Sequence, residues 1–83
     1  MLEILYFTAK WCQPCISMAP TIHKLKKTVD IETIDVEQNV SLVTKYGIRS
    51  IPTFIFLKEG FEVLRKSGSI SEAEFKHYIK MLN

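Results

Sequence analysis

The feature that most constrains the fold is a pair of short, strongly apolar runs far apart in the chain. They are L-E-I-L-Y-F-T, residues Leu2–Thr8, and I-P-T-F-I-F-L, residues Ile51–Leu57. The first run is almost wholly apolar and shows no regular polar alternation, a pattern typical of a strand covered on both faces. A sheet that contains such a strand needs helices on both sides, so we expect an α/β fold.

The spacing of apolar residues changes from strand-like to helical after the first run. A helix is expected from Pro14 to about Lys27, with one face turned inward. Pro14 suits the first turn, where its missing N–H leaves no helical hydrogen bond unmade. Pro20 lies inside the pattern and is expected to kink the helix. The apolar residues at helical spacing are Cys15, Met18, Ala19, Ile22, Leu25 and Val29.

The rest of the chain predicts further helices and strands, with recognisable ends. Asn39 is placed to cap a short helix and Gly47 to end it. Ser71 and Glu74 form the S-x-x-E capping box of a last helix. The expected ranges are a strand Asp30–Val36, a helix Val40–Tyr46, a strand Phe61–Lys66 after the turn Lys58-Glu59-Gly60, and a last helix that buries Phe75, Tyr78, Ile79 and Leu82.

The order of elements is therefore β-α-β-α-β-β-α. The first two strands, joined by a helix, should form a right-handed parallel unit, and the last two should form an antiparallel hairpin. We expect a four-stranded mixed sheet with helices on both faces. Residues 1–83 are expected to form a single domain, since no linker or repeat divides them.

Charge and composition exclude several classes of function. The net charge of +2 is too mild to indicate nucleic-acid binding. No apolar run approaches the ~20 residues of a membrane span. The N-terminus lacks the basic start and cleavage site of a signal peptide. We therefore expect a cytoplasmic protein, and in that setting a cysteine pair points to metal or redox chemistry before a structural disulfide.

The only two cysteines lie in W-C-Q-P-C, residues Trp11–Cys15. A closed zinc site needs four ligands, but His23 and His77 are not paired at ligand spacing, so no metal site is expected. A structural disulfide across so short a loop would add little stability, because the entropic gain grows with loop length. A redox pair is the remaining interpretation.

The redox interpretation accounts for both cysteines and for Trp11 and Pro14 beside them. Cys12 falls at the helix N-terminus, where the free N–H groups and the dipole favour the thiolate, the nucleophilic form. Lys10 is close enough in sequence to help. Cys12 would attack a substrate disulfide, and Cys15, one turn on and facing inward, would resolve the mixed disulfide. Pro14 stiffens the loop, and Trp11 should lie half exposed beside the nucleophile.

This stretch and several other segments resemble those of the thioredoxin superfamily. W-C-Q-P-C is similar to the family's W-C-G-P-C, and K-Y-G-I-R-S-I-P-T, Lys45–Thr53, is similar to the segment through the family's cis-proline. Ala9, Met18-Ala19-Pro20, Lys58-Glu59-Gly60 and Gly68 also match. The resemblance implies a cis Ile51–Pro52 peptide bond facing the cysteines. It also implies a flat docking surface for extended substrates, formed by Trp11, Ile51, Pro52, Thr53 and Gly68.

Three departures from the family pattern bear on the chemistry. The chain begins at the family's second strand, so the resemblance implies the minimal thioredoxin fold, without the extra N-terminal strand and helix and close to glutaredoxins and compact archaeal or phage proteins. Gln13 replaces a glycine. Tyr6 stands where thioredoxins bury an aspartate, and Thr33 where they carry a lysine. A phenol, with an ordinary pKa of about 10, cannot act as a carboxylate base, but it can donate a hydrogen bond to a sulfur.

The resemblance implies a thiol–disulfide oxidoreductase that reduces protein disulfides and binds no cofactor. Electrons would come from an NADPH-dependent flavoprotein of the thioredoxin-reductase type, and ribonucleotide reductase is an expected client. We expect a monomer without nucleic-acid or membrane partners. A glutathione-dependent, glutaredoxin-like reductase and a non-catalytic binding module stay open as alternatives.

Overall fold

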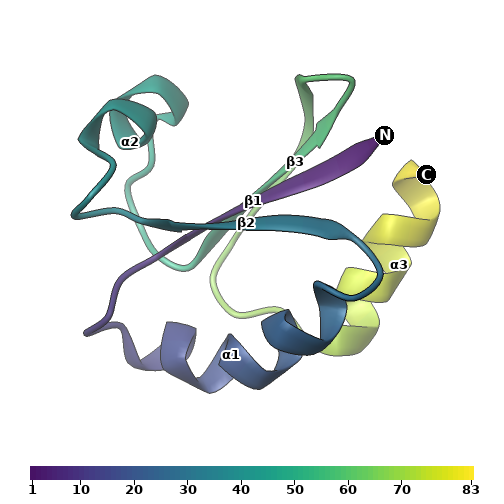
Figure 1. Ribbon diagram of the computed structural model, residues 1–83, viewed down its shortest axis with the longest axis horizontal. Coiled ribbons are helices and arrows are strands. Elements are labelled where there is room, and N and C mark those ends of the chain that lie inside the picture. Colours follow the sequence, from purple (N-terminus) through teal and green to yellow (C-terminus); the bar gives the residue numbers. More distant parts are fainter.

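The computed structural model describes all residues, 1–83, as a sheet with helices on both sides (Figure 1). None of the helices combines the length and apolar character needed to cross a membrane. The elements are β1 (Leu2–Thr8), α1 (Gln13–Leu25), β2 (Asp30–Asp35), α2 (Val40–Tyr46), β3 (Thr53–Lys58), β4 (Phe61–Ser67) and α3 (Glu72–Leu82). The expected β-α-β-α-β-β-α order is confirmed.

The four strands lie in the order β2-β1-β3-β4. β1 runs parallel to β2 and antiparallel to β3, and β3 runs antiparallel to β4. Tyr6, near the end of β1, is therefore flanked by Thr33 of β2 and Phe54 of β3. The sheet is mixed, as expected, and its central strands β1 and β3 are the two apolar runs of the sequence.

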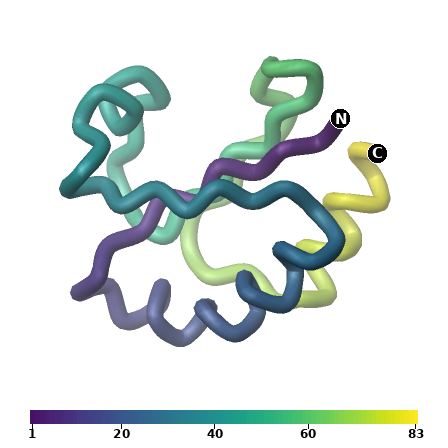
Figure 2. The backbone as a smooth tube through the Cα atoms, viewed as in Figure 1, coloured from purple at the N-terminus to yellow at the C-terminus, as the bar shows by residue number.

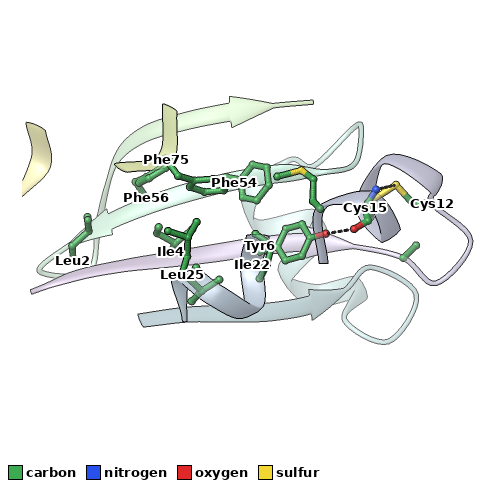
Figure 3. Close-up of a cluster of buried hydrophobic side chains, with 13 residues drawn as sticks. Leu2, Ile4, Tyr6, Cys12, Cys15, Ile22, Leu25, Phe54, Phe56 and Phe75 are labelled. Carbon is green, nitrogen blue, oxygen red and sulfur yellow. Dashed lines mark hydrogen bonds between the residues drawn. A yellow bond between two sulfur atoms is a disulfide. The ribbon is translucent and has the colours of Figure 1, made fainter. Parts of the chain in front are cut away.

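One face of the sheet is covered by α1 and α3 (Figure 1). Successive side chains of a strand point to opposite faces, and alternate residues of β1 and β3 meet the helices there. Phe75 of α3 is fully buried and lies edge-on against Phe54, with ring centroids 4.8 Å apart. The largest members of this cluster, most of them labelled in Figure 3, are Leu2, Ile4, Tyr6, Met18, Ile22, Leu25, Ile31, Phe54, Phe56 and Phe75.

The opposite face carries the intervening residues of the same strands, and α2 lies over it (Figure 1). Phe7 is fully buried there and meets the ring of Tyr46 with centroids 6.0 Å apart. The buried residues of this cluster are Leu5, Phe7, Ile34, Ile55 and Leu57, and α2 adds Leu42, Val43 and Tyr46. Because both faces are covered, both apolar runs can lack regular polar alternation.

The two ends of the chain lie near each other, beside the turn between β3 and β4 (Figure 2). The Met1 amino group donates to Glu59 at 2.6 Å. The Lys58 ammonium donates to the carbonyl of Leu82 at 2.7 Å. This turn therefore connects the first strand with the last helix, at the opposite end of β1 from the cysteines.

Several helix and strand ends differ from the expectations. β3 begins at Thr53, two residues later than expected, since Pro52 has no N–H for the ladder. α1 ends at Leu25 rather than Lys27. Asn39 occupies the N-cap of α2 but makes no side-chain cap; its amide donates instead to the Asp35 carbonyl at 2.9 Å. The left-handed Gly47 at the end of α2 and the capping box of α3 are confirmed.

Candidate active site

The two cysteines form a disulfide at the start of α1 (Figure 3). Cys12 is the N-cap residue, and Cys15 lies in the first turn, with 5.2 Å between their Cα atoms. The Cys15 amide donates to Cys12 Sγ at 3.3 Å. Cys12 and Cys15 are only 5% and 3% exposed. The helix thus directs a backbone N–H at Cys12 Sγ, the position where a thiolate would carry its charge.

No acidic residue in the first turn of α1 would repel a negative charge on Cys12. Gln13 opens α1, and Pro14 follows in its first turn. Both are exposed. Lys10 is also exposed and forms no ion pair, so the structure gives no direct contact for the help expected from it. The helix terminus itself is therefore the main source of positive potential at Cys12.

Tyr6 lies beneath Cys15 and is 4% exposed. Its ring stacks on Phe54, with centroids 5.0 Å apart and planes 5° from parallel. Its hydroxyl donates to the backbone carbonyl of Cys15 at 3.3 Å (Figure 3). The expectation that this hydroxyl could serve a sulfur is corrected: the ring is held by Phe54 in a position from which the hydroxyl reaches the main chain of α1. Tyr6 therefore connects β1 with the first turn of α1.

The segment before β3 contains the residues expected to receive substrates. The Ile51–Pro52 peptide bond is cis. The Pro52 carbonyl accepts from the Gly68 amide at 2.8 Å, where Gly68 has φ 88°. Thr53 is buried and donates its hydroxyl to the Ser50 carbonyl at 2.7 Å. The hydrogen bond between Gly68 and Pro52 thus holds the start of β3 beside the end of β4, and the Thr53 hydroxyl fixes the turn before β3.

Trp11 is 63% exposed, somewhat more than the half expected. A cavity of about 190 Å³ lies between its side chain and Ile51. The remaining residues that line this cavity are Val36, Val43, Ile48, Arg49 and Ser50. The structure therefore brings Trp11 of the cysteine stretch next to Ile51, which is 40 residues away in the sequence.

A larger cavity of about 390 Å³, the α1–β2 slot, lies beside Cys15 and was not expected from the sequence. Tyr6 and Thr33 line it, so the residues that replace the family's aspartate and lysine lie on one cavity. The only signal for it is the four-residue spacing of Cys15, Ala19 and His23, which places them on one side of α1. The other residues that line it are Thr8, Ala9, Ile16, Ile22 and Lys26.

The carboxylates with a lowered pKa lie away from this site, in surface ion pairs. A hydrogen bond from the amino terminus lowers the pKa of Glu59, and one from Arg65 lowers that of Glu62. Hydrogen bonds from Lys76 and then Lys24 lower the pKa of Glu72. No aspartate or glutamate lines either cavity. No three His, Cys, Asp or Glu side chains lie close enough together to hold a metal ion.

Comparison with known proteins places this geometry in a family. Residues 2–81 match the family described as Thioredoxin. The chain is 35% identical to thioredoxin 2 of Plasmodium falciparum over 93% of its own length and 52% of that protein's. It is 31% identical to a thioredoxin of Buchnera aphidicola, over 88% of its own length and 71% of the relative's.

A solved structure shows the same arrangement. A thioredoxin variant of Halobacterium salinarum superposes with a TM-score of 0.91 at 29% identity, over 96% of this chain and 73% of that one. The chain thus spans about half the length of the Plasmodium relative and about three quarters of this archaeal one. With a family match over nearly its whole length and a cysteine pair at a helix N-terminus, the chain belongs to the thioredoxin family.

Proposed function

We propose that the protein is a thiol–disulfide oxidoreductase that reduces protein disulfides through Cys12 and Cys15. The observation that carries the proposal is the disulfide at the N-terminus of α1, where Cys12 Sγ accepts a hydrogen bond from the Cys15 amide at 3.3 Å. Such a position lowers the pKa of a cysteine thiol from about 8.5 toward neutrality. Family membership supports the same activity.

The reductive reaction proceeds in two thiol–disulfide exchanges. In the first, the Cys12 thiolate attacks one sulfur of the substrate disulfide, and the other substrate sulfur leaves as a thiolate. In the second, Cys15 loses its proton and attacks Cys12 Sγ. The bond between Cys12 and the substrate breaks, the substrate leaves with both bonding electrons, and the Cys12–Cys15 disulfide remains. The first attack is assigned to Cys12 because its sulfur, at the N-cap of α1, accepts a hydrogen bond from the Cys15 N–H, which favours the thiolate form.

The substrate is proposed to dock beside the disulfide as an extended segment. Trp11 and Ile51 supply an apolar surface next to the cysteines. The backbone of Ile51, before the strand begins, can pair with the segment as an added strand would. Pro52, Thr53 and Gly68 hold that backbone in place through the bonds described above. Gln13 and Pro14 are exposed at the same helix end and contribute to the rim of the surface.

The reducing side of the cycle is also a proposal. Electrons are assigned to an NADPH-dependent flavoprotein of the thioredoxin-reductase type, with no cofactor held by this chain. Disulfide-containing proteins are the proposed substrates, with ribonucleotide reductase among them, and the proposed setting is a single-domain monomer in the cytoplasm. Two alternatives would replace this proposal: a reductase that takes its electrons from glutathione, and a module that binds partners without catalysis.

The test is an insulin-reduction assay with purified protein. Turnover is measured with NADPH and thioredoxin reductase, and separately with NADPH, glutathione and glutathione reductase. We expect turnover with the first pair, none with Cys12→Ser, and a trapped mixed disulfide on Cys12 with Cys15→Ser. Turnover with glutathione alone would indicate the glutaredoxin-like reductase. A biological activity that survives the double replacement Cys12→Ser/Cys15→Ser would indicate a binding module.

A further inference from the structure

The second exchange requires Cys15 to lose a proton from a buried position. Cys15 is 3% exposed, and burial among apolar groups raises the pKa of a cysteine thiol, because it disfavours the charged form. The residue beneath it is Tyr6, whose hydroxyl donates to the Cys15 carbonyl. Tyr6 has no carboxylate that could accept the proton. No aspartate or glutamate lines the α1–β2 slot on which Cys15 opens. The proton must therefore pass to another group or to solvent.

The slot offers a route from Cys15 to an imidazole. Cys15, Ala19 and His23 follow one another at four-residue intervals on α1, and all three line the slot. Eight residues of helix place His23 about 12 Å from Cys15 along the axis, at a rise of about 1.5 Å per residue. Ala19 lies between them, and its small side chain leaves space in the slot between Cys15 and His23.

Water can occupy this space. A hydrogen-bonded chain of about four steps of about 2.8 Å covers the distance from Cys15 to His23. A water takes about 30 Å³ of liquid volume, whereas the slot measures about 390 Å³. Three residues that carry hydroxyl groups, Tyr6, Thr8 and Thr33, are among those that line it, and hydroxyls are suitable polar partners for such waters.

We propose that His23 accepts, through water in the α1–β2 slot, the proton that Cys15 loses when it resolves the mixed disulfide. This rests on the proposed oxidoreductase function. The Cys15 proton passes along the waters to the free ring nitrogen of His23, which is exposed and releases it to bulk solvent. The Cys15 thiolate then displaces the substrate thiolate from Cys12 Sγ, so that the electron pair of the broken bond leaves with the substrate.

His23 is the group in the slot that fits this role. The ionisable groups that line the slot are Tyr6 from β1, Cys15 and His23 from α1, and Lys26, which caps the end of α1. The strand β2 contributes only the uncharged Thr33. Lys26 carries an ammonium group, which has no acceptor site. Tyr6 is engaged with the Cys15 carbonyl. Imidazole is the side chain that ordinarily exchanges protons in the neutral pH range.

The test separates the two exchanges in time. Reduced protein is mixed in a stopped-flow instrument with excess Ellman's reagent, an aromatic disulfide whose released thiolate is coloured. The first release reports attack by Cys12 and depends on reagent concentration, whereas the second reports resolution by Cys15 and does not. At neutral pH we expect His23→Ala to slow the second release about tenfold, below the usual effect of a direct general base because solvent competes. The first release should be unchanged, and added imidazole should restore the second.

Controls make the result specific. His77→Ala removes the only other histidine, on α3, and should alter neither release. Ala19→Leu narrows the slot between Cys15 and His23 and should slow the second release without rescue by imidazole. An unchanged second release in either His23→Ala or Ala19→Leu overturns the proposal, as does a slowed release in His23→Ala that imidazole does not restore. A slow first release in the unaltered protein would instead count against the proposed function.

Discussion

Replacing Tyr6 with phenylalanine tests how β1 supports the cysteine helix. The change removes one hydroxyl, which donates to the Cys15 carbonyl at 3.3 Å from a side chain that is 4% exposed. It keeps the ring and its stacking on Phe54, with centroids 5.0 Å apart. The perturbation is therefore confined to a single hydrogen bond between the sheet and the first turn of α1.

The expected cost in stability follows from that bond. A typical intramolecular hydrogen bond contributes about 0.5–1.5 kcal/mol net. At 3.3 Å this one is longer than the usual O–H···O distance of about 2.7–2.8 Å, so Tyr6→Phe should cost about 0.5–1 kcal/mol. For a domain of this size the unfolding midpoint should fall by about 2–8 °C. The rate of disulfide reduction should change only a few-fold, because the hydroxyl reaches a carbonyl rather than a sulfur.

Urea unfolding and the insulin-reduction rate measure the two effects. Of the three tyrosines, Tyr6 and Tyr78 donate hydroxyl hydrogen bonds and Tyr46 does not, so Tyr46→Phe is the matched control, with an expected change within about 0.5 kcal/mol. A rate loss beyond about a hundredfold in Tyr6→Phe, the scale of a general acid or base, would refute this reasoning and make the hydroxyl part of the chemistry.

The remaining predictions concern α3. Phe75→Ala removes a fully buried ring in contact with Phe54 and should cost about 3–5 kcal/mol, a large share of the roughly 4–12 kcal/mol expected for a chain of this length. A loss below about 1 kcal/mol in urea unfolding would contradict this packing. Glu72 pairs with Lys76 at 2.9 Å and Lys24 at 3.1 Å. Lys76 and then Lys24 depress its pKa below the ordinary 4.5, so its stabilisation is present above that pH and is lost as pH falls through the folded-state pKa. Glu72→Gln should remove this loss of stability when the urea unfolding midpoint is measured at decreasing pH. If the midpoint of the variant falls with pH as it does in the unaltered protein, the two ion pairs contribute nothing to stability.

Most of the fold could be predicted because its signals are local. The two central strands could be recognised because each is a short and nearly unbroken apolar run, and the structure buries their alternate residues on opposite faces of the sheet. The capping box at Ser71 and the left-handed Gly47 depend on a few consecutive positions. The start of β3 was misplaced because an apolar run does not show which of its residues join the ladder.

The sequence by itself determined the element order, the cysteine pair at a helix N-terminus and the apolar character of both faces, since each follows from spacing within one segment. Only the tertiary structure decided that the Tyr6 hydroxyl meets the Cys15 carbonyl, that Asn39 bonds back to Asp35 rather than capping its helix, and that a slot beside Cys15 extends to His23. The physical reason is that a hydrogen-bond partner and an unfilled volume depend on how β1, α1 and β2 pack against one another. Their side chains leave a volume unfilled between them, and the spacing of residues within one segment does not predict the position or size of that volume.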